Sequence, residues 1–149
     1  MTTLLALDIG GTKVGWGIVE AGDTYEVTER GSIPTDAMRG GADVAARICE
    51  LASSLVASHP SVSGVAVASA GVVNPATGDI VSATGTMPGW GGTNLGAQLE
   101  AATGLRVRVL NDVHAHGLGE ATLGAGQPYR IVLSIAVGTG IGGALVEDR

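Results

Sequence analysis

The sequence has few aromatic and basic residues and only one cysteine. Phe is absent and aromatic residues make up 3% of the chain. The single cysteine, Cys49, excludes an internal disulfide and a cysteine-rich metal site. Lys13 is the only lysine, the arginines are spread singly, and the formal net charge is −6, so no basic stripe is available for a nucleic-acid backbone. No apolar run reaches membrane-spanning length, and no basic leader precedes the first apolar segment. We therefore expect a cytoplasmic, soluble protein that binds neither nucleic acid nor membrane.

The composition is typical of a globular chain with close backbone packing. Apolar residues make up 45% of the 149 residues, and the 25 glycines are scattered rather than gathered into repeats. This length is usual for one domain and short for an enzyme built of two lobes. The sequence therefore predicts one complete α/β domain at most.

Apolar periodicity predicts the secondary structure of most of the chain. Two short apolar runs around Gly10 and Gly11 indicate a β-hairpin, and seven apolar residues at three- and four-residue steps indicate a helix that stops near Pro60. We expect strands at 4–9, 14–19, 25–33, 62–70, 106–110, 131–136 and 142–146, and helices at 42–59, 94–103 and 112–123. The segment 71–92 is rich in Gly, Pro, Asn and Thr, which favours an irregular loop with a role in substrate binding.

The two ends of the chain resemble each other. When residues 5–20 are placed on residues 132–147 with one offset, Gly11-Thr12 meets Gly138-Thr139, Gly15 meets Gly142, and Glu20 meets Glu147. Such a repeat indicates a duplicated fold whose second copy begins near the end of the chain. Two glycine-containing hairpins can also resemble each other by chance, and the pattern alone leaves both interpretations open.

The segment Asp8–Lys13 lies at the tip of the first expected hairpin. Glycines allow backbone N–H groups to approach an anion, and the Thr12 hydroxyl can add a donor, so the segment is a candidate phosphate cradle. Asp8, at the end of a strand, could hold hydrated magnesium. An ordinary Gly-Gly turn beside a solvated carboxylate fits this short string as well.

A second glycine-rich string runs from Gly138 to Gly143. A strand follows it where the dinucleotide-binding fingerprint requires a helix, so that fingerprint does not apply. As the partner of the first hairpin turn it would offer a second phosphate cradle. Taken by itself the string is only a flexible turn.

Asn111 and Asp112 end one expected strand and begin a helix. A carboxylate is favoured at a helix N-terminus, and Asp112 there could accept a proton from an alcohol as a general base. The alternative is that Asp112 only caps the helix.

His114 and His116 are two residues apart and point to different sides of a helix, which disfavours a shared metal site. For Trp90, burial as a loop anchor is favoured over a role as a ligand platform.

Together these strings resemble the ROK (repressor, ORF, kinase) family of sugar kinases. The similarity rests on the order and spacing of Leu7–Lys13, Gly71–Gly78, Pro88–Trp90, Val109–Asp112, Gly119-Glu120 and Val137–Gly143. It implies an α/β fold of the actin-like, hexokinase-like (ribonuclease H-like) ATPase class, in which a three-stranded antiparallel meander is extended by strand-helix units. It also implies domains at 1–126 and 127–149, the second being the first hairpin of a copy that is cut off.

The resemblance implies ATP-dependent phosphorylation of a hexose, normally on the C6 hydroxyl. Asp112 would be the catalytic base, and Gly71, Thr84, Asn111 and Asp112 would bind the sugar. The nucleotide phosphates would be held by Gly10, Gly11, Thr12, Lys13, Gly138, Thr139 and Gly140, with Asp8 placing Mg²⁺ through water.

The departures from the family also matter. Family kinases continue into a second lobe with a Cys/His zinc motif and the nucleoside pocket, and the zinc site is absent from this chain. We therefore expect little activity from these residues alone, and a catalytically silent sugar-binding or assembly domain stays open as the alternative. Inorganic polyphosphate as the donor also stays open. The strands at 131–136 and 142–146 would expose apolar faces, so we expect them to fold back on the first domain or to pair with another chain.

Overall fold

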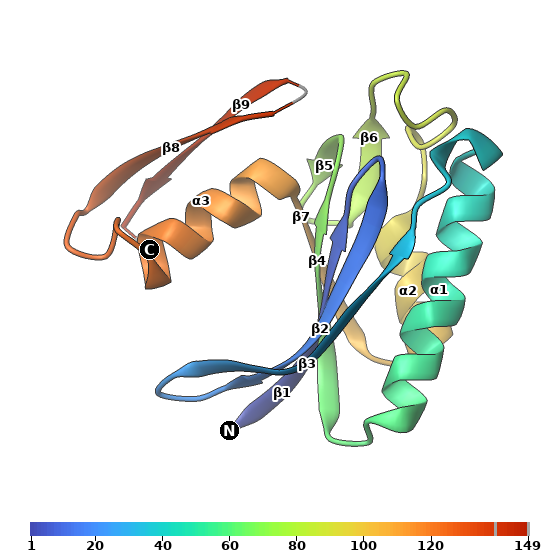
Figure 1. The fold of residues 1–149 in the computed structure, drawn as a ribbon, viewed down its shortest axis with the longest axis horizontal. Helices are drawn as coiled ribbons and strands as arrows, with labels where there is room; N and C mark the ends of the chain where they lie inside the picture. Colours follow the sequence, from blue (N-terminus) through green and yellow to red (C-terminus); the bar gives the residue numbers. More distant parts are fainter. Residues whose placement is uncertain (139, 149) are drawn as a thin grey trace. The chain divides into compact units, whose positions relative to one another are not determined.

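The computed structural model describes residues 1–138 and 140–148, which form two compact units. The first unit comprises Met1–Leu110, and the second comprises the described residues from Asn111 onward. Figure 1 gives the order of their elements along the chain. Within the described residues, no helix is both long enough and apolar enough to cross a membrane.

The first unit is built on a five-stranded sheet with the strand order β3-β2-β1-β4-β7. Its strands are β1 (Thr2–Ile9), β2 (Lys13–Ala21), β3 (Tyr25–Pro34), β4 (Val62–Ser69) and β7 (Arg106–Asn111). The first three strands pair antiparallel in sequence order, and β4 joins β1 in parallel. This arrangement confirms the predicted meander and its extension by strand-helix units.

The helices of the first unit lie on one face of this sheet. α1 (Gly41–Ser58) and α2 (Leu95–Thr103) pack side by side, with the short 3₁₀ helix η1 (Ala37–Arg39) ahead of α1. Alternation along β1 sends Leu5, Leu7 and Ile9 into the core beneath the helices, whereas Asp8 faces outward and is exposed. The sequence pattern therefore fixes which side chains of the first strand face solvent.

The segment 71–92 is more regular than the sequence predicted. It contains a two-stranded ribbon of β5 (Val72–Asn74) and β6 (Asp79–Ser82), closed by a turn in which the Gly78 N–H donates to the Asn74 carbonyl over 2.8 Å. The prediction of an irregular loop was wrong for these strands. Each strand is too short to show a period, but Asn74 and Gly78 enclose a turn between two apolar pairs.

The second unit consists of one helix and one hairpin. α3 (Asp112–Leu123) packs against the hairpin of β8 (Ile131–Val137) and β9 (Ile141–Glu147). Glycines allow this close approach: a Cβ at Gly117 would lie 2.6 Å from the Cβ of Ala144, and one at Gly142 would lie 2.7 Å from Cγ2 of Val113. One face of the hairpin is therefore closed by α3.

The repeated hairpins differ in their turns. β1 and β2 pair up to Ile9 and Val14, whereas β8 and β9 pair up to Val137 and Ile141, so the second turn is one residue shorter. A single offset therefore does not relate the two hairpins throughout. Ile18 pairs with Leu5, and Leu145 pairs with Leu133. If Ile18 is matched with Leu145, then Leu5 is matched with Leu133, whereas the single offset matches Leu5 with Val132. The duplication and the domain boundary between residues 126 and 127 stay predictions.

Candidate active site

The candidate phosphate cradle is a tight turn between β1 and β2. The Gly10 N–H donates to the Lys13 carbonyl over 3.0 Å. Gly11 and Thr12 at its tip are exposed, and a Cβ at Gly11 would have no atom within 4 Å. A ligand phosphate could therefore approach the backbone here without meeting a side chain.

Thr35 follows β3 directly and holds the candidate cradle through two hydrogen bonds. Its hydroxyl donates to the Gly10 carbonyl over 2.6 Å, and its N–H donates to the Thr12 carbonyl over 3.0 Å. The side chain is fully buried. Sequence reasoning missed this residue, because no motif marks a threonine that is distant in sequence and acts on the turn only through tertiary hydrogen bonds.

An arginine on α1 extends this support. Arg47 donates from its guanidinium to the carbonyls of Pro34 and Thr35, and its Nε donates to Asp43 over 2.8 Å. The Arg47 hydrogen bond is the main reason that the pKa of Asp43 is lowered. The cradle is therefore tied through Thr35 to the first helix.

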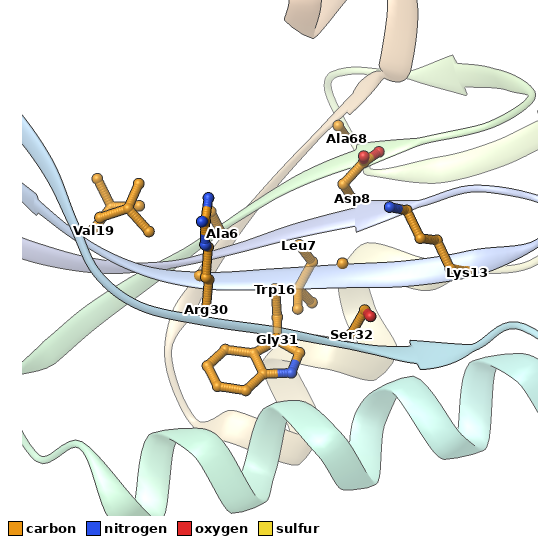
Figure 2. Close-up of a pocket in the computed structure, with 13 residues that line it drawn as sticks. Ala6, Leu7, Asp8, Lys13, Trp16, Val19, Arg30, Gly31, Ser32 and Ala68 are labelled. Carbon is orange, nitrogen blue, oxygen red and sulfur yellow. The ribbon is translucent and has the colours of Figure 1, made fainter.

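An open cavity of about 700 Å³ lies beside the cradle within the first unit. Asp8, Lys13, Arg30 and Ser32 are among its lining residues, and Figure 2 shows Asp8 and Lys13 on neighbouring strands. Gly15 forms part of the lining opposite Asp8 and leaves room there, since a Cβ at Gly15 would have its nearest neighbour at 3.8 Å. The structure thus brings Asp8, predicted to hold magnesium, and Lys13, predicted to bind phosphate, into the lining of one cavity.

Asp8 is the only carboxylate among these lining residues. Magnesium keeps most of its waters and is bound through few carboxylates, so one exposed aspartate beside a glycine turn fits a water-mediated Mg²⁺. Among the residues that the structure describes, no group of three or more metal-binding side chains occurs.

Gly71 and Thr84, predicted to line a sugar pocket, belong to one loop system near the cradle. The Ala70 N–H donates to the Ile9 carbonyl over 2.9 Å, which ties the start of the loop to the end of β1. Gly71 has φ +99°, and a Cβ there would lie 2.8 Å from the Ser82 carbonyl oxygen. The close contact places Gly71 against the end of β6, two residues before Thr84.

Trp90 anchors this loop system, as predicted. Its ring is fully buried, and its indole N–H donates to the Ala70 carbonyl at 3.2 Å and lies 3.3 Å from the Ser69 hydroxyl. The indole therefore fixes the end of β4 from which Gly71 departs.

Asn111 and Asp112 form one hydrogen-bonded pair at the start of α3. Asn111 is the N-cap, and its Oδ1 accepts from the N–H groups of Val113 and His114 over 3.0 and 3.2 Å. Its Nδ2 donates to Oδ1 of Asp112 over 2.9 Å, and the Val113 N–H donates to that same oxygen. The cap is therefore Asn111, and the alternative that Asp112 is the N-cap was wrong.

This pairing gives the two oxygens of Asp112 different roles. Oδ1 is engaged by the Asn111 amide and by a helix N–H, which fixes the carboxylate plane. The residue is half-buried and lies where the helix N-terminus favours a negative charge. The other carboxylate oxygen, Oδ2, is the one that could accept a hydrogen bond from a hydroxyl group.

The second predicted cradle is a short turn in the second unit. The Gly138 N–H donates to the Gly140 carbonyl over 2.8 Å, and both glycines are exposed. Thr139, which was predicted to bind phosphate with them, lies outside the described residues. Asp8, the first cradle, Gly71 and Thr84 thus belong to the first unit, and Asn111, Asp112 and the second cradle to the second unit.

Comparison with known proteins identifies the family. A sequence model described as the ROK family matches residues 4–149. The chain belongs to the ROK family.

Several ROK relatives are named as sugar kinases. A beta-glucoside kinase of Listeria monocytogenes is 35% identical over 145 residues, covering 97% of this chain and 47% of the relative. The ROK glucokinase of Streptomyces griseus, solved with glucose and AMPPNP, is 28% identical with a TM-score of 0.83, covering 98% of this chain and 45% of that one. An inorganic polyphosphate/ATP-glucomannokinase of Arthrobacter is 35% identical with a TM-score of 0.83, and the match covers 99% of this chain and 59% of that one.

These similarities confirm the predicted hexokinase-like, actin-like α/β fold. They also show that the chain spans about half the length of the curated relatives it matches. The residues that it matches are those of one part of a longer kinase.

Proposed function

We propose that this chain is the sugar-side half of an ATP-dependent hexose kinase, with Asp112 as the general base. The observation that carries the proposal is the geometry of the Asn111–Asp112 pair. One carboxylate oxygen is held by the Asn111 amide and a helix N–H, which leaves the other oxygen for a substrate hydroxyl. The names of the ROK relatives, glucokinase and beta-glucoside kinase, support a sugar as the acceptor.

In the proposed reaction the sugar oxygen attacks the γ-phosphorus of ATP. A new oxygen–phosphorus bond forms, the bond to the bridging β-phosphate oxygen breaks, and ADP leaves. The hydroxyl proton passes to Oδ2 of Asp112. Asn111 acts as a positioning residue, since its amide holds Oδ1 and so directs Oδ2. Gly71 and Thr84 would contact the sugar from the loop system that Trp90 anchors.

The backbone of Gly10, Gly11 and Thr12 would receive phosphate oxygens, with Lys13 adding a positive charge. Gly138 and Gly140 would do the same from the second turn. Asp8 would hold Mg²⁺ through water, and this ion neutralises phosphate charge when it is bound. The hydrogen bond from Thr35 to the Gly10 carbonyl would keep this turn in place.

A catalytically silent sugar-binding or assembly domain is the second candidate. A base without the rest of an enzyme can orient a sugar but lacks groups that would complete the site and exclude water. We therefore expect weak hexose binding and little or no turnover from the 149 residues alone.

The test measures binding and turnover with the same protein preparations. Hexoses, including glucose and a β-glucoside, are titrated calorimetrically, and phosphorylation is assayed with ATP and with inorganic polyphosphate. Asp112→Asn removes the base but keeps its shape, and Asp36→Asn is the control, because Asp36 precedes η1 and makes no side-chain cap. We expect hexose binding that weakens at least several-fold in Asp112→Asn and is unchanged in Asp36→Asn.

Two outcomes would change this assignment. Turnover that Asp112→Asn abolishes would show that the half-enzyme is competent and would remove the silent-domain alternative. If the wild-type chain binds no hexose at millimolar concentration, the sugar-side assignment is wrong.

A further inference from the structure

The first two turns of α1 contact both parts of the candidate site that lie in the first unit. One part is the phosphate cradle. The other is the loop of residues 84–90, which we call the 84–90 loop and which begins at Thr84, predicted to bind the sugar. Figure 1 shows the start of α1 at the same end of this unit as the tip of the β1–β2 hairpin and the loop that follows β6. One helix therefore contacts the phosphate side and the sugar side.

Arg47 acts on the cradle through Thr35. Its Nη1 donates to the Pro34 carbonyl over 3.1 Å and its Nη2 donates to the Thr35 carbonyl, so the planar guanidinium binds two successive peptide groups. Asp43, one turn earlier in α1, orients the guanidinium by accepting from its Nε over 2.8 Å. Thr35 in turn donates its hydroxyl to the Gly10 carbonyl over 2.6 Å. The place of Arg47 therefore fixes the place of the Gly10 carbonyl.

The hydrogen bond to the Gly10 carbonyl decides which group the cradle presents at its tip. In a trans peptide the C=O and the following N–H point in opposite directions. Because the Gly10 carbonyl is directed at the buried Thr35 hydroxyl, the Gly11 N–H is directed away from it, at an exposed position. A rotated peptide would present an oxygen there, which repels phosphate. Arg47 therefore orients a donor for phosphate without contacting the phosphate.

Gly41, the first residue of α1, fixes the 84–90 loop. Its N–H donates to the Pro88 carbonyl over 2.8 Å. A Cβ at Gly41 would overlap the Gly89 carbonyl group and would lie 2.7 Å from the Trp90 nitrogen. Only a glycine at this position therefore allows the loop backbone to lie against the start of the helix.

Two successive turns transmit this constraint to Thr84. The Trp90 N–H donates to the Met87 carbonyl over 3.2 Å, and the Met87 N–H donates to the Thr84 carbonyl over 3.3 Å. Met87 and Trp90 are buried, whereas Thr84 is exposed. Gly41 and Arg47 both lie on α1, about 9 Å apart along its axis. A single rigid element therefore sets where the cradle and the 84–90 loop lie relative to each other.

We propose that Arg47 and Gly41 are positioning residues, through which α1 places the phosphate cradle and the 84–90 loop independently of each other. The identity of the two ligands rests on the proposed function, whereas the contacts of α1 do not. Loss of the Arg47 hydrogen bonds weakens phosphate binding and leaves hexose binding unchanged, and crowding at Gly41 does the reverse. A residue that only stabilises the fold would change both affinities together.

NMR titrations of the 149-residue chain with two probes, inorganic tripolyphosphate with Mg²⁺ and glucose, test the proposal. Arg47→Met removes the donors at nearly the same side-chain length. We expect it to weaken tripolyphosphate binding roughly three- to tenfold, the effect of losing about one hydrogen bond. Arg39→Met is the matched control, because Arg39 carries the same charge and pairs with the same Asp43 over 3.0 Å, but donates to neither of the carbonyls that Arg47 holds.

Gly41→Ala tests the sugar side. Its methyl group crowds the Gly89 carbonyl, so we expect weaker glucose binding by a similar factor and tripolyphosphate binding as in the wild type. Ala42→Ser, at the exposed next position of α1, also adds one heavy atom and is the control. Gly89→Ala strains the same contact from the exposed loop, where φ is +72°, and takes the place of Gly41→Ala if that variant does not fold.

Amide hydrogen exchange in the same samples needs no ligand, and so separates this proposal from the proposed function. The Gly10 N–H reports on the cradle turn, and the Trp90 N–H reports on the 84–90 loop. We expect faster exchange at Gly10 alone in Arg47→Met and at Trp90 alone in Gly41→Ala. A general loss of stability would speed exchange at both.

The remaining outcomes overturn one proposal or the other. A wild-type chain that binds neither probe refutes the proposed function, and the exchange pattern then still decides whether α1 fixes the two sites separately. Exchange that changes at both sites, or at neither, overturns the positioning roles. Arg39→Met with an effect as large as that of Arg47→Met shows that charge, and not the hydrogen bonds to the two carbonyls, controls phosphate binding.

Discussion

Thr35 stabilises the candidate phosphate cradle, although it lies far from the cradle in the sequence. Its hydroxyl and its N–H bind the carbonyls of Gly10 and Thr12, which are the two ends of the cradle tip. A change at this single buried side chain therefore alters a turn that lies 25 residues away along the chain.

Thr35→Val removes the hydroxyl and keeps the side-chain shape. The part-buried Gly10 carbonyl then loses its donor, and the loss of one such hydrogen bond costs about 0.5–1.5 kcal/mol of the free energy of unfolding. Urea denaturation followed by circular dichroism measures this loss. Thr35→Ser keeps the hydroxyl and serves as the matched control. If the serine variant loses as much stability as the valine variant, packing of the methyl group and not the hydrogen bond holds the turn.

His59 gives the protein a pH-dependent contact between β3 and the end of α1. Its Nε2 lies 2.9 Å from the Glu29 carboxylate and its Nδ1 lies 2.8 Å from the Leu55 carbonyl. The hydrogen bond to Glu29, followed by that to Leu55, raises the pKa of His59 above its ordinary value. Two acceptors at the two ring nitrogens favour the imidazolium form.

The sign of the pH effect follows from this raised pKa. The contact stabilises the fold fully below the unfolded-state pKa of about 6.5, and this stabilisation is lost as the pH rises through the higher folded-state pKa of His59. Urea midpoints of the wild type and of Glu29→Gln, measured from pH 5.5 to 8.5, should therefore converge at the alkaline end. Midpoints that differ by the same amount at every pH would show that His59 protonation is not involved.

At the level of the residue, sequence reasoning identified side chains with chemical motifs but not those defined by contacts. Asp112 and the glycines of the first turn were predicted because the strings that contain them resemble the motifs of the ROK family, whereas their residue types alone left an ordinary cap and an ordinary turn open. The sugar contact predicted for Asn111 stays a prediction, and the structure shows that its side chain caps α3 and holds Asp112. Thr35 and Arg47 carried no motif.

α3 offers a direct test of how the second unit is packed, because two of its glycines have opposite surroundings. A Cβ at Gly117 would lie 2.6 Å from the Cβ of Ala144, whereas a Cβ at Gly119 would have no atom within 4 Å. Both positions lie inside the same helix, two residues apart.

Gly119→Ala should stabilise the protein by about 0.5–1 kcal/mol, since alanine restricts the unfolded chain and favours the helix. Gly117→Ala has the same intrinsic gain but forces α3 away from β9, at a cost of about 1–3 kcal/mol. Thermal unfolding of the two variants measures the difference. Equal melting temperatures would mean that α3 does not pack on the hairpin as described.

The long helices were predicted well, whereas the two shortest strands were missed. The helix expected at 42–59 is observed at Gly41–Ser58, and the one at 112–123 is observed at Asp112–Leu123. The helix expected at 94–103 is observed at Leu95–Thr103, and Gly104 ends it with a left-handed φ of +69°. The β5–β6 ribbon was missed, because strands of three and four residues contain at most two periods of alternation.

On the scale of the whole molecule, the two compact units differ in the size of their cores. The first unit contains nearly all of the buried apolar side chains, including Trp90 and Leu99, whereas the second contributes Ala121 and Ala144. The second unit therefore relies on the tight glycine contacts between α3 and the β8–β9 hairpin.

The sequence by itself determined the family, the meander, the main helices and the chemical types at the candidate site, since these depend on local periodicity and on motifs that a short stretch of chain contains. Tertiary structure decided the rest. Only folding shows that Thr35 holds the cradle, that Asn111 fixes the plane of Asp112, and that one residue fewer in the second turn changes the register of β8 against β9. These features depend on contacts between distant residues, which a linear pattern does not contain.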